Sequence, residues 1–221
     1  MEARLTALGV DPGRIDAILL SHEHGDHARG AERFAGRFGS LVAGSRSTLR
    51  AAGLRGPAER LLAFESGETF TVGRLRVATA GVSHDAADPV GFRVETGEGR
   101  IGFALDLGKA TDAVCDLLAG CGTMILEANH DPEMLERGPY PRELKERLRG
   151  PRGHLSNVEA ADLLEEVAGR STRTLVLAHL SRTNNRPDLA MAAAHSALSK
   201  RGARPRLVVA EQGPSPRWIE V

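Results

Sequence analysis

A short polar segment, SHEHGDH at residues 21–27, brings three histidines and one aspartate together within the chain. Imidazole and carboxylate groups are common ligands of divalent transition metals. His22 and His24 are two residues apart, so in extended chain their side chains point to the same side. The glycine that follows lets the chain turn, so that Asp26 and His27 can face a neighbouring point. The segment therefore predicts a metal site, and the alternative is a solvated polar loop.

Three further candidate ligands each follow an apolar stretch that we interpret as a strand. LRVATAGVS leads into His84, IGFAL leads into Asp106, and TLVLA leads into His179. Taken singly, these residues have ordinary alternatives: a turn residue, a helix cap and a buried structural histidine. Sheets in α/β folds gather strand ends at one edge, where ligands commonly bind. We therefore predict that all three join the first segment in one pocket.

This set of side chains is large enough for two divalent metal ions, zinc or manganese. A pair of ions about 3.5–4 Å apart can activate a bridging water near neutral pH and hydrolyse a bond. The seven predicted ligands form two sets of three and one bridging carboxylate: His22, His24 and His84; Asp26, His27 and His179; and Asp106.

The elements that must position these groups alternate between short apolar strands and helices, which indicates one α/β domain with a mixed sheet over residues 1–221. We predict strands at 15–21, 41–43, 61–64, 69–72, 75–80, 91–95, 101–105, 123–127, 174–178, 207–210 and 217–221. We predict helices at 28–39, 45–52, 112–119, 143–148, 157–167 and 189–200. Ser156 and Glu159 have the spacing of a capping box, and the helix that follows carries an apolar stripe that includes Val158 and Leu164.

Composition excludes several other classes of protein. Lys and Arg together number 29, and so do Asp and Glu, so the net charge does not indicate a polyanionic partner. The two cysteines, Cys115 and Cys121, cannot form a disulfide framework, and we expect buried free thiols and a cytoplasmic location. No apolar run approaches the ~20 residues that a membrane span needs, so we expect no membrane partner.

H-x-H-x-D-H after a strand, followed by separated His, Asp and His, resembles the metallo-β-lactamase superfamily. Glu127 in LEANHD, His154 in GHLSN and His179 in AHLS resemble the late motifs of its phosphodiesterase branch, which is related to tRNase Z. The wording SHDAADPVGF, DLGKAT, GPYP and AHLSRTNN is similar to the YycJ/WalJ-like group of 5′-exonucleases acting on DNA. The resemblance covers nearly all of the chain and implies a four-layer αββα sandwich.

One departure from the family concerns the residues before the first motif. Only 21 residues precede His22, fewer than members of the family usually carry. We therefore expect the first sheet to be short of its N-terminal strands. Such an uncovered edge would favour homo-oligomerisation, or would leave the chain less stable than a longer form.

The resemblance also implies catalytic roles beyond metal binding. His154 would face the leaving group, and Glu127 would orient or charge it, since a carboxylate partner raises the pKa of a histidine. Asp26 is counted with them as a catalytic residue. The ordinary alternatives are a loop histidine before a helix and a carboxylate at a strand end.

Other polar residues are weaker candidates for contact with a substrate. Ser181, Asn184 and Asn185 follow the last predicted ligand and could hold phosphate oxygens, although a solvated loop fits as well. Tyr140 could stack on a base or anchor its loop, and His130 could be a ligand, support a ligand or be structural. Basic residues gather at 28–63 and 137–152, where they could meet a phosphate backbone or simply be solvated.

These observations predict a dinuclear metal-dependent phosphodiesterase. We expect a 5′-exonuclease that acts on DNA and uses a metal-bridging hydroxide as its nucleophile. One alternative is a hydrolase of small thioesters, lactams or lactones, but a good leaving group would not need the Glu127–His154 pair. Two further alternative functions are an endonuclease that matures tRNA and a non-catalytic metal-dependent binding or sensor protein.

Overall fold

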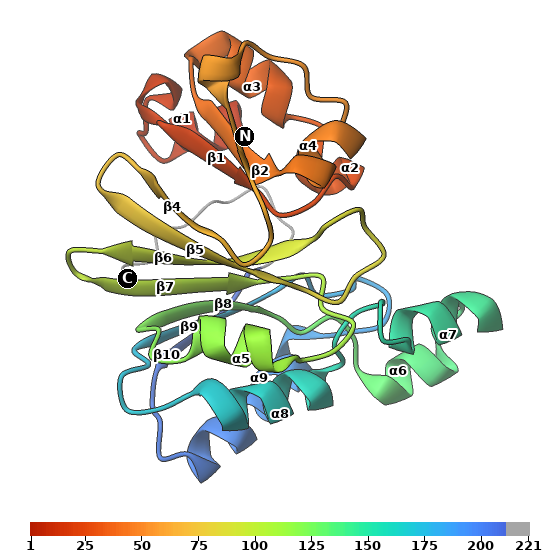
Figure 1. Cartoon of the computed structure of the whole chain (residues 1–221). Coiled ribbons are helices and arrows are strands. Elements are labelled where there is room, and N and C mark those ends of the chain that lie inside the picture. Colours follow the sequence, from red (N-terminus) through yellow and green to blue (C-terminus); the bar gives the residue numbers. More distant parts are fainter. Residues whose placement is uncertain (211–221) are drawn as a thin grey trace.

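Two sheets lie face to face between layers of helices in the computed structural model, which describes residues 1–210 (Figure 1). Within these residues the first sheet has three parallel strands in the order β1-β2-β3, and the second has seven in the order β10-β9-β8-β7-β6-β5-β4. Strands β4 to β7 pair antiparallel, whereas β7 to β10 pair parallel. The strands are β1 (Ala17–Leu20), β2 (Leu41–Ser45), β3 (Leu61–Phe64), β4 (Thr69–Val72), β5 (Leu75–Gly81), β6 (Val90–Thr96), β7 (Gly99–Ala104), β8 (Thr123–Glu127), β9 (Thr174–Ala178) and β10 (Arg206–Val209).

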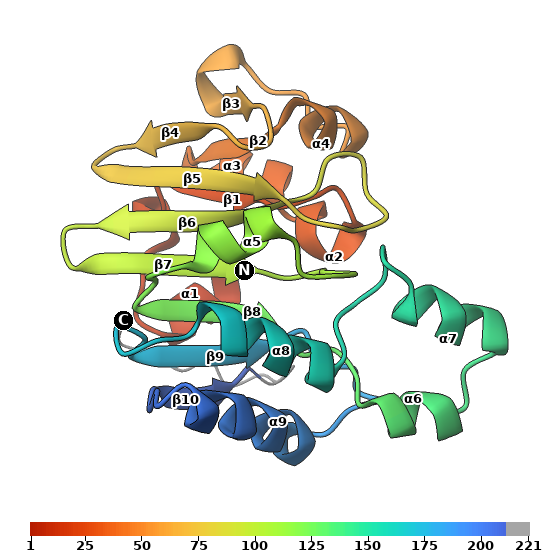
Figure 2. The ribbon, with the colours of Figure 1, turned by 60° about the horizontal axis from the view of Figure 1, so that its bottom comes forward.

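The helices cover the two outer faces of this pair of sheets. Helices α3 and α4 lie on the first sheet, and α5, α8 and α9 lie on the second (Figures 1 and 2). Helices α6 and α7 lie beyond one edge of the second sheet (Figure 2). The α-helices are α1 (Glu2–Ala7), α2 (Gly25–Ala28), α3 (Ala31–Phe38), α4 (Arg46–Ala51), α5 (Asp112–Leu118), α6 (Pro132–Arg137), α7 (Arg142–Arg149), α8 (Asn157–Val167) and α9 (Pro187–Lys200), and the short 3₁₀ helices are η1 (Pro12–Arg14) and η2 (Ala58–Arg60).

Three apolar cores separate the four layers. Successive side chains of a strand point to opposite faces, so Val42 of β2 packs toward the helices while its neighbour Ala43 packs toward the second sheet. Phe64 and Phe92 meet in the core between the sheets, with ring centroids 6.3 Å apart. The third core lies between the second sheet and α5, α8 and α9, and it contains Cys121. Both cysteines are buried free thiols, as predicted.

Helix α8 begins as the sequence predicts, and its predicted apolar stripe packs against the core at Ala161, Leu164 and Val167. The Ser156 side chain accepts from the backbone N–H of Glu159, and the Glu159 side chain accepts from the backbone N–H of Ser156, so the capping box is confirmed. The predicted stripe is wrong at Val158, which is 55% exposed. The buried residues of α8 are Asn157, Ala160, Leu163 and Leu164. The polar Asn157 is among them because its side-chain amide donates to that of Asn185.

Two other differences from the sequence prediction concern helices. The predicted helix at 28–39 is shorter in the structure, where α3 begins after Gly30, its N-cap, and the separate turn α2 ends at Ala28. Helix α6 was not predicted, although Asp131 caps it and Pro132 begins it. The strand predicted at 217–221 lies outside the described residues. Within residues 1–210, no helix has both the length and the apolar character of a membrane span.

Candidate metal centre

The predicted ligands gather at one edge of the sandwich, where several strands end. His22 follows β1, His84 follows β5, Asp106 follows β7 and His179 directly follows β9. A cavity of about 260 Å³ opens there and is lined by six of the imidazole and carboxylate groups considered above: His24, Asp26, His84, Asp106, His154 and His179. The convergence predicted from strand ends is therefore found in the fold.

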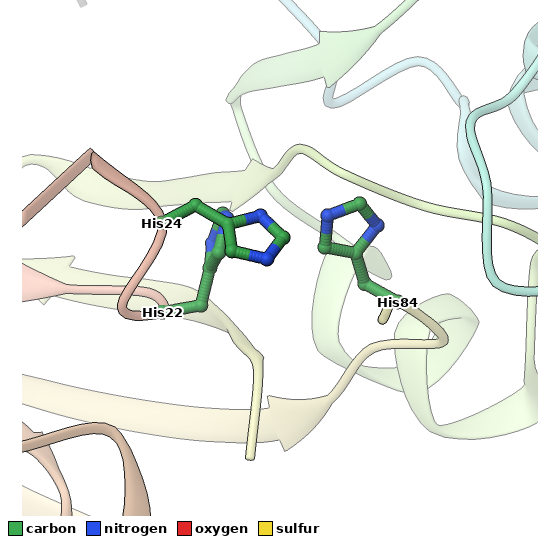
Figure 3. A group of neighbouring side chains, drawn as sticks. All are labelled: His22, His24 and His84. Atoms are coloured by element: carbon green, nitrogen blue, oxygen red, sulfur yellow. The ribbon is translucent and has the colours of Figure 1, made fainter. Parts of the chain in front are cut away.

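The first cluster consists of His22, His24 and His84. One ring nitrogen from each lies within 4.8 Å of the others. Figure 3 shows His22 and His24 on one segment and His84 on a facing loop, with the three rings turned toward one another. The Nε2 atom of His22 is buried and has no hydrogen-bond partner. A divalent ion bound by these nitrogens would satisfy that atom, so the residues fit a metal.

The second cluster consists of Asp26, His27 and His179, again with one candidate ligand atom each within 4.8 Å. The backbone N–H of His27 donates to the carbonyl of His24 at 2.9 Å, because the chain enters the single turn of α2 at Gly25. This turn brings the His27 ring beside that of His22, with ring centroids 4.1 Å apart, and groups Asp26 and His27 with His179. Both predicted sets of three residues therefore occur as groups in the structure.

Asp106 lies between the two clusters. Its Oδ2 atom is 3.1 Å from Nε2 of His27, and its Oδ1 atom is 3.4 Å from Nδ1 of His179. It also groups with His22 and His27 as a third possible metal-holding set, and with Glu127, His154 and His179 as a fourth. The carboxylate is 3% exposed, so its charge is shielded from water. This central position is the one expected of a bridging carboxylate.

Burial and neighbouring charges shift the pKa values of the metal-free cluster in opposite directions. Burial, helped by the nearby His27, lowers the pKa of His22 to about 4. For His179, burial is outweighed by the hydrogen bond to Glu127 and by the charge of Asp106, which raise its pKa to about 9. Burial also opposes ionisation of Asp106, but the surrounding imidazoles hold its pKa below the usual range. At neutral pH the metal-free protein therefore holds His22 as the neutral imidazole that a metal ligand must be. His179 is instead the positively charged imidazolium, with a proton on each ring nitrogen.

Glu127, the last residue of β8, holds two imidazoles at once. Its Oε1 atom accepts from Nδ1 of His154 at 2.8 Å and from Nδ1 of His179 at 2.7 Å. Its Oε2 atom accepts from the backbone N–H groups of Leu107 and Leu155. Burial raises its pKa, but the two imidazoles outweigh burial and keep the pKa below the ordinary value.

The consequence of this arrangement is a fixed tautomer at both histidines. An ionised carboxylate can only accept, so His154 and His179 must each carry a proton on Nδ1. Their Nε2 atoms are then the ones left for a metal or a substrate. The sequence predicted that Glu127 would orient His154, but gave no signal that it would also hold His179.

Two further groups that hydrogen-bond to the candidate ligands were not predicted from the sequence. The hydroxyl of Ser21 lies 3.2 Å from Nδ1 of His22 and 3.3 Å from Nδ1 of His27. The Nδ1–H group of His84 donates to the carbonyl of Gly153 at 3.2 Å. A side chain at Gly153 would overlap the carbonyl oxygen of Leu148, so this close approach requires glycine. Of the two, only Ser21 could have been found from the sequence, because it lies within the SHEHGDH segment itself.

The predicted substrate contacts lie in the loop after β9. The hydroxyl of Ser181 accepts from the backbone N–H groups of Thr183 and Asn184. The side chain of Asn184 is fully buried, and Asn185 exchanges two amide hydrogen bonds of 2.9 Å with Asn157. In this structure Ser181 and Asn185 brace the loop, whereas the buried amide of Asn184 has no hydrogen-bond partner among the described residues. Contact of these three residues with a substrate stays a prediction.

The remaining histidines lie outside these groups. His130 is buried, and its backbone carbonyl accepts from the N–H of Asn157 at 2.8 Å. Among the described residues it joins none of the possible metal-holding sets. His195 is exposed on α9. The role of His130 stays open between a support of the site and a structural residue.

Comparison with known sequences identifies relatives over most of the chain. Residues 3–180 match the family described as the Beta-lactamase superfamily domain. The exodeoxyribonuclease YycJ of Bacillus anthracis is 32% identical over 191 residues, which are 85% of this chain and 72% of YycJ. The exodeoxyribonuclease WalJ of Streptococcus pneumoniae serotype 2 is also 32% identical, over 84% of this chain and 71% of WalJ.

Solved structures agree on the fold. The metallo-β-lactamase fold protein YhfI of Bacillus subtilis superposes with a TM-score of 0.69 at 16% identity, covering 91% of this chain and 78% of YhfI. Zn²⁺-bound PqqB of Methylobacterium extorquens superposes with a TM-score of 0.63 at 20% identity, covering 90% of this chain and 72% of PqqB. The predicted αββα sandwich is thus confirmed, and the chain belongs to the metallo-β-lactamase superfamily of metal-dependent hydrolases, in the YycJ/WalJ group.

Proposed function

We propose that this chain is a dinuclear metal-dependent phosphodiesterase that removes nucleotides from the 5′ end of DNA. The observation that carries the proposal is the Glu127–His154 hydrogen bond of 2.8 Å beside the two clusters. A histidine fixed in this way can give a proton to a departing alkoxide, which a phosphodiester needs. The names of the two relatives, both exodeoxyribonucleases, support the same class of substrate.

The proposed metal ligands are the seven predicted from the sequence. One zinc or manganese ion would be held by His22, His24 and His84, the other by Asp26, His27 and His179, and Asp106 would serve both. When bound, such a pair of ions supplies an activated water and offsets the negative charge of the phosphate. The buried, unpartnered Nε2 atom of His22 supports the first position.

The protein's own groups then have separate tasks. His154 is 17% exposed at its side chain and lines the cavity, where Nε2 of its imidazolium form can donate a proton to the leaving oxygen. Glu127 keeps one proton of His154 on Nδ1, so the second proton, on Nε2, is the one that can be transferred. Asp26, whose side chain is 70% exposed, also lines the cavity, where its carboxylate would help to hold the second ion.

The cavity is wide enough for a phosphate group. Its volume of about 260 Å³ lies near the lower end of the ~300–1,000 Å³ of ligand pockets. A phosphate group can enter while the rest of the strand stays outside.

We further propose that residues 1–221 act as one cytoplasmic catalytic domain, and that β1, at the edge of the first sheet, can pair with a second copy. Sedimentation at several concentrations tests the pairing, which a monomer throughout would contradict.

The decisive experiment supplies zinc- or manganese-loaded protein with single- and double-stranded DNA and RNA labelled at either end. We expect mononucleotides to appear first from the 5′ end of DNA. Asp106→Ala, which removes the shared carboxylate, is the inactive control. Hydrolysis of a thioester, lactam or lactone without phosphodiester cleavage would replace the proposal with the small-molecule alternative, and bound metal with no turnover would favour a sensor.

A further inference from the structure

One wall of the cavity is built by α7 and the loop that follows it. Leu144, Arg147 and Leu148 of α7 line the cavity, together with Arg152 and Gly153 of the loop. In Figure 2, α6 and α7 project beyond the edge of the second sheet, on the side where the ligand-bearing strands end. We call α6, α7 and the loop through Gly153 the arm. The arm is in place to meet any strand of nucleic acid that reaches the two clusters.

The arginines of the arm divide into two kinds. Arg137, Arg142 and Arg149 pair with the arm's own carboxylates, Glu133, Glu146 and Glu136 respectively. Arg147 and Arg152 instead face the cavity, and neither pairs with a carboxylate of the arm among the described residues. Their charges are thus directed toward the cavity.

Arg147 is held at the rim of the cavity by Asp85, which follows the predicted ligand His84 in the chain. Its Nη2 atom lies 2.5 Å from Oδ2 of Asp85, and its Nε atom lies 3.0 Å from the same oxygen. Oδ1 of Asp85 lies 3.4 Å from Nε2 of His84. The Arg147 side chain is 65% exposed, so its guanidinium is fixed in place yet open to an incoming anion.

The arm is also tied to the proposed proton donor. The backbone N–H of His154 donates to the carbonyl of Leu148 in α7 at 2.9 Å. The Nε–H group of Arg152 donates to the carbonyl of His84 at 3.4 Å. Arg147, Arg152 and His154 are therefore carried by one continuous segment, so a phosphate bound by the arginines would be positioned relative to His154.

We propose that Arg147 and Arg152 form a clamp for the backbone phosphate adjoining the one that is cleaved. The inference rests on the proposed function and adds to it the residues that recognise a polymer. A planar guanidinium matches the oxygens of a phosphate with paired hydrogen bonds, and contacts of this kind position a strand without reading its bases. The clamp distinguishes an oligonucleotide from an isolated phosphodiester.

The test compares Arg147→Gln and Arg152→Gln with Arg142→Gln. Arg142 lies on the same helix, but its side chain is 91% exposed and pairs with Glu146, so its variant is the matched control. Binding of a labelled single-stranded DNA oligonucleotide is followed by fluorescence anisotropy in chelator at several salt concentrations. We expect each clamp variant to weaken binding by about 10-fold and to lower the slope of log K against log salt by about 0.7. Arg147→Lys, which keeps the charge, should recover the slope.

Steady-state kinetics with metal-loaded protein provide the second readout. We expect the clamp variants to raise the ratio of KM for the oligonucleotide to KM for bis(p-nitrophenyl) phosphate, and Arg142→Gln to leave it unchanged. Clamp variants that bind and cleave DNA like Arg142→Gln would overturn the clamp while leaving the proposed function intact. Wild-type protein that does not bind DNA would overturn it too. Wild-type protein that binds DNA but cleaves no phosphodiester would defeat the proposed function, and the anisotropy data would still decide the clamp.

Discussion

Asp106 and His179 share an uncommon backbone conformation, with φ of 58° at each, and Oδ1 of Asp106 lies 3.4 Å from Nδ1 of His179. They are the only non-glycine residues with positive φ among residues 1–210. This left-handed region costs free energy for side chains other than glycine, and residues held in it cluster at functional sites. The turns after β7 and β9 thus bring both side chains into the same pocket at some cost in stability.

The first prediction separates a metal ligand from a proton donor. Asp106→Ala should lose bound metal, because it removes the carboxylate between the two clusters. His154→Ala should keep its metal but cleave phosphodiesters about 10²–10⁴-fold more slowly, the usual contribution of a general acid or base. Metal content by mass spectrometry and rates on labelled DNA check both. Equal metal loss in the two variants would make His154 a ligand, as its group with Asp106, Glu127 and His179 allows.

The second prediction concerns the shared carboxylate. Glu127→Gln replaces the charge that His154 and His179 both contact. In metal-free protein the pKa of His179 should fall from about 9 toward its ordinary value near 6.5, as NMR titration of the imidazole can show. Glu133→Gln, on the exposed face of α6, is the control. A pKa of His179 that stays near 9 in Glu127→Gln would mean that Asp106 alone maintains it.

The third prediction is a loss of stability in mild acid after chelation. The pKa of His22 is about 4 in the folded protein and near 6.5 in the unfolded chain, so the unfolded chain binds the proton first. Stability is therefore lost as the pH falls from 6.5 to 4, by on the order of 3 kcal/mol from His22. The lowered pKa values of His84 and His130, caused mainly by burial, act in the same direction. Urea unfolding at several pH values measures the slope.

His22→Gln should flatten this slope, and His195→Gln, which changes an exposed histidine, should not. The lowered pKa values of the buried carboxylates Asp106 and Glu127 act in the same direction, but only below about pH 5, where the unfolded carboxylates take up protons, so the slope from pH 6.5 to about 5 reports the histidines. A stability that is constant from pH 6.5 to 4 in the chelated wild type would contradict the prediction.

The fourth prediction uses the glycine behind His84. Gly153→Ala would force the new methyl group into the carbonyl of Leu148, so the loop must move and the hydrogen bond to His84 must lengthen. We expect lower activity and a loss of stability of about 1–3 kcal/mol. Gly36→Ala in α3, where a methyl group meets nothing within 4 Å, should instead stabilise by about 0.5–1 kcal/mol. Thermal unfolding and DNA cleavage of both variants provide the check, and equal behaviour would contradict it.

The ligands could be predicted from the sequence because their signals are local. A run of apolar residues ends, and a histidine or aspartate follows, as at His84, Asp106 and His179. Supports made across the fold had no such signal. The second hydrogen bond of Glu127 and the carbonyl of Gly153 depend on which loops meet, and that is decided by the packing of β7, β8 and β9.

Helix α8 shows why one position of the predicted apolar stripe is wrong. Leu164, Ala161 and Val167 pack against the core, but Val158 is exposed. Its neighbour Asn157 is buried instead, because its amide pairs with Asn185 in the loop after β9. A buried amide that is fully paired costs little, and hydrophobic spacing alone does not reveal such a pair.

The clusters draw their members from both sheets, since the 21–27 segment follows β1 of the first sheet while His84, Asp106 and His179 follow strands of the second. A bound ion would therefore act as a cross-link between the two halves of the sandwich, in addition to the apolar core between them. Chelation should uncouple the halves unequally. Amide hydrogen exchange should accelerate more in β1, β2 and β3 than in β7, β8 and β9, because the smaller sheet has fewer strands to hold it in place. Uniform exchange with and without metal would mean that the sheets are joined by their apolar core alone.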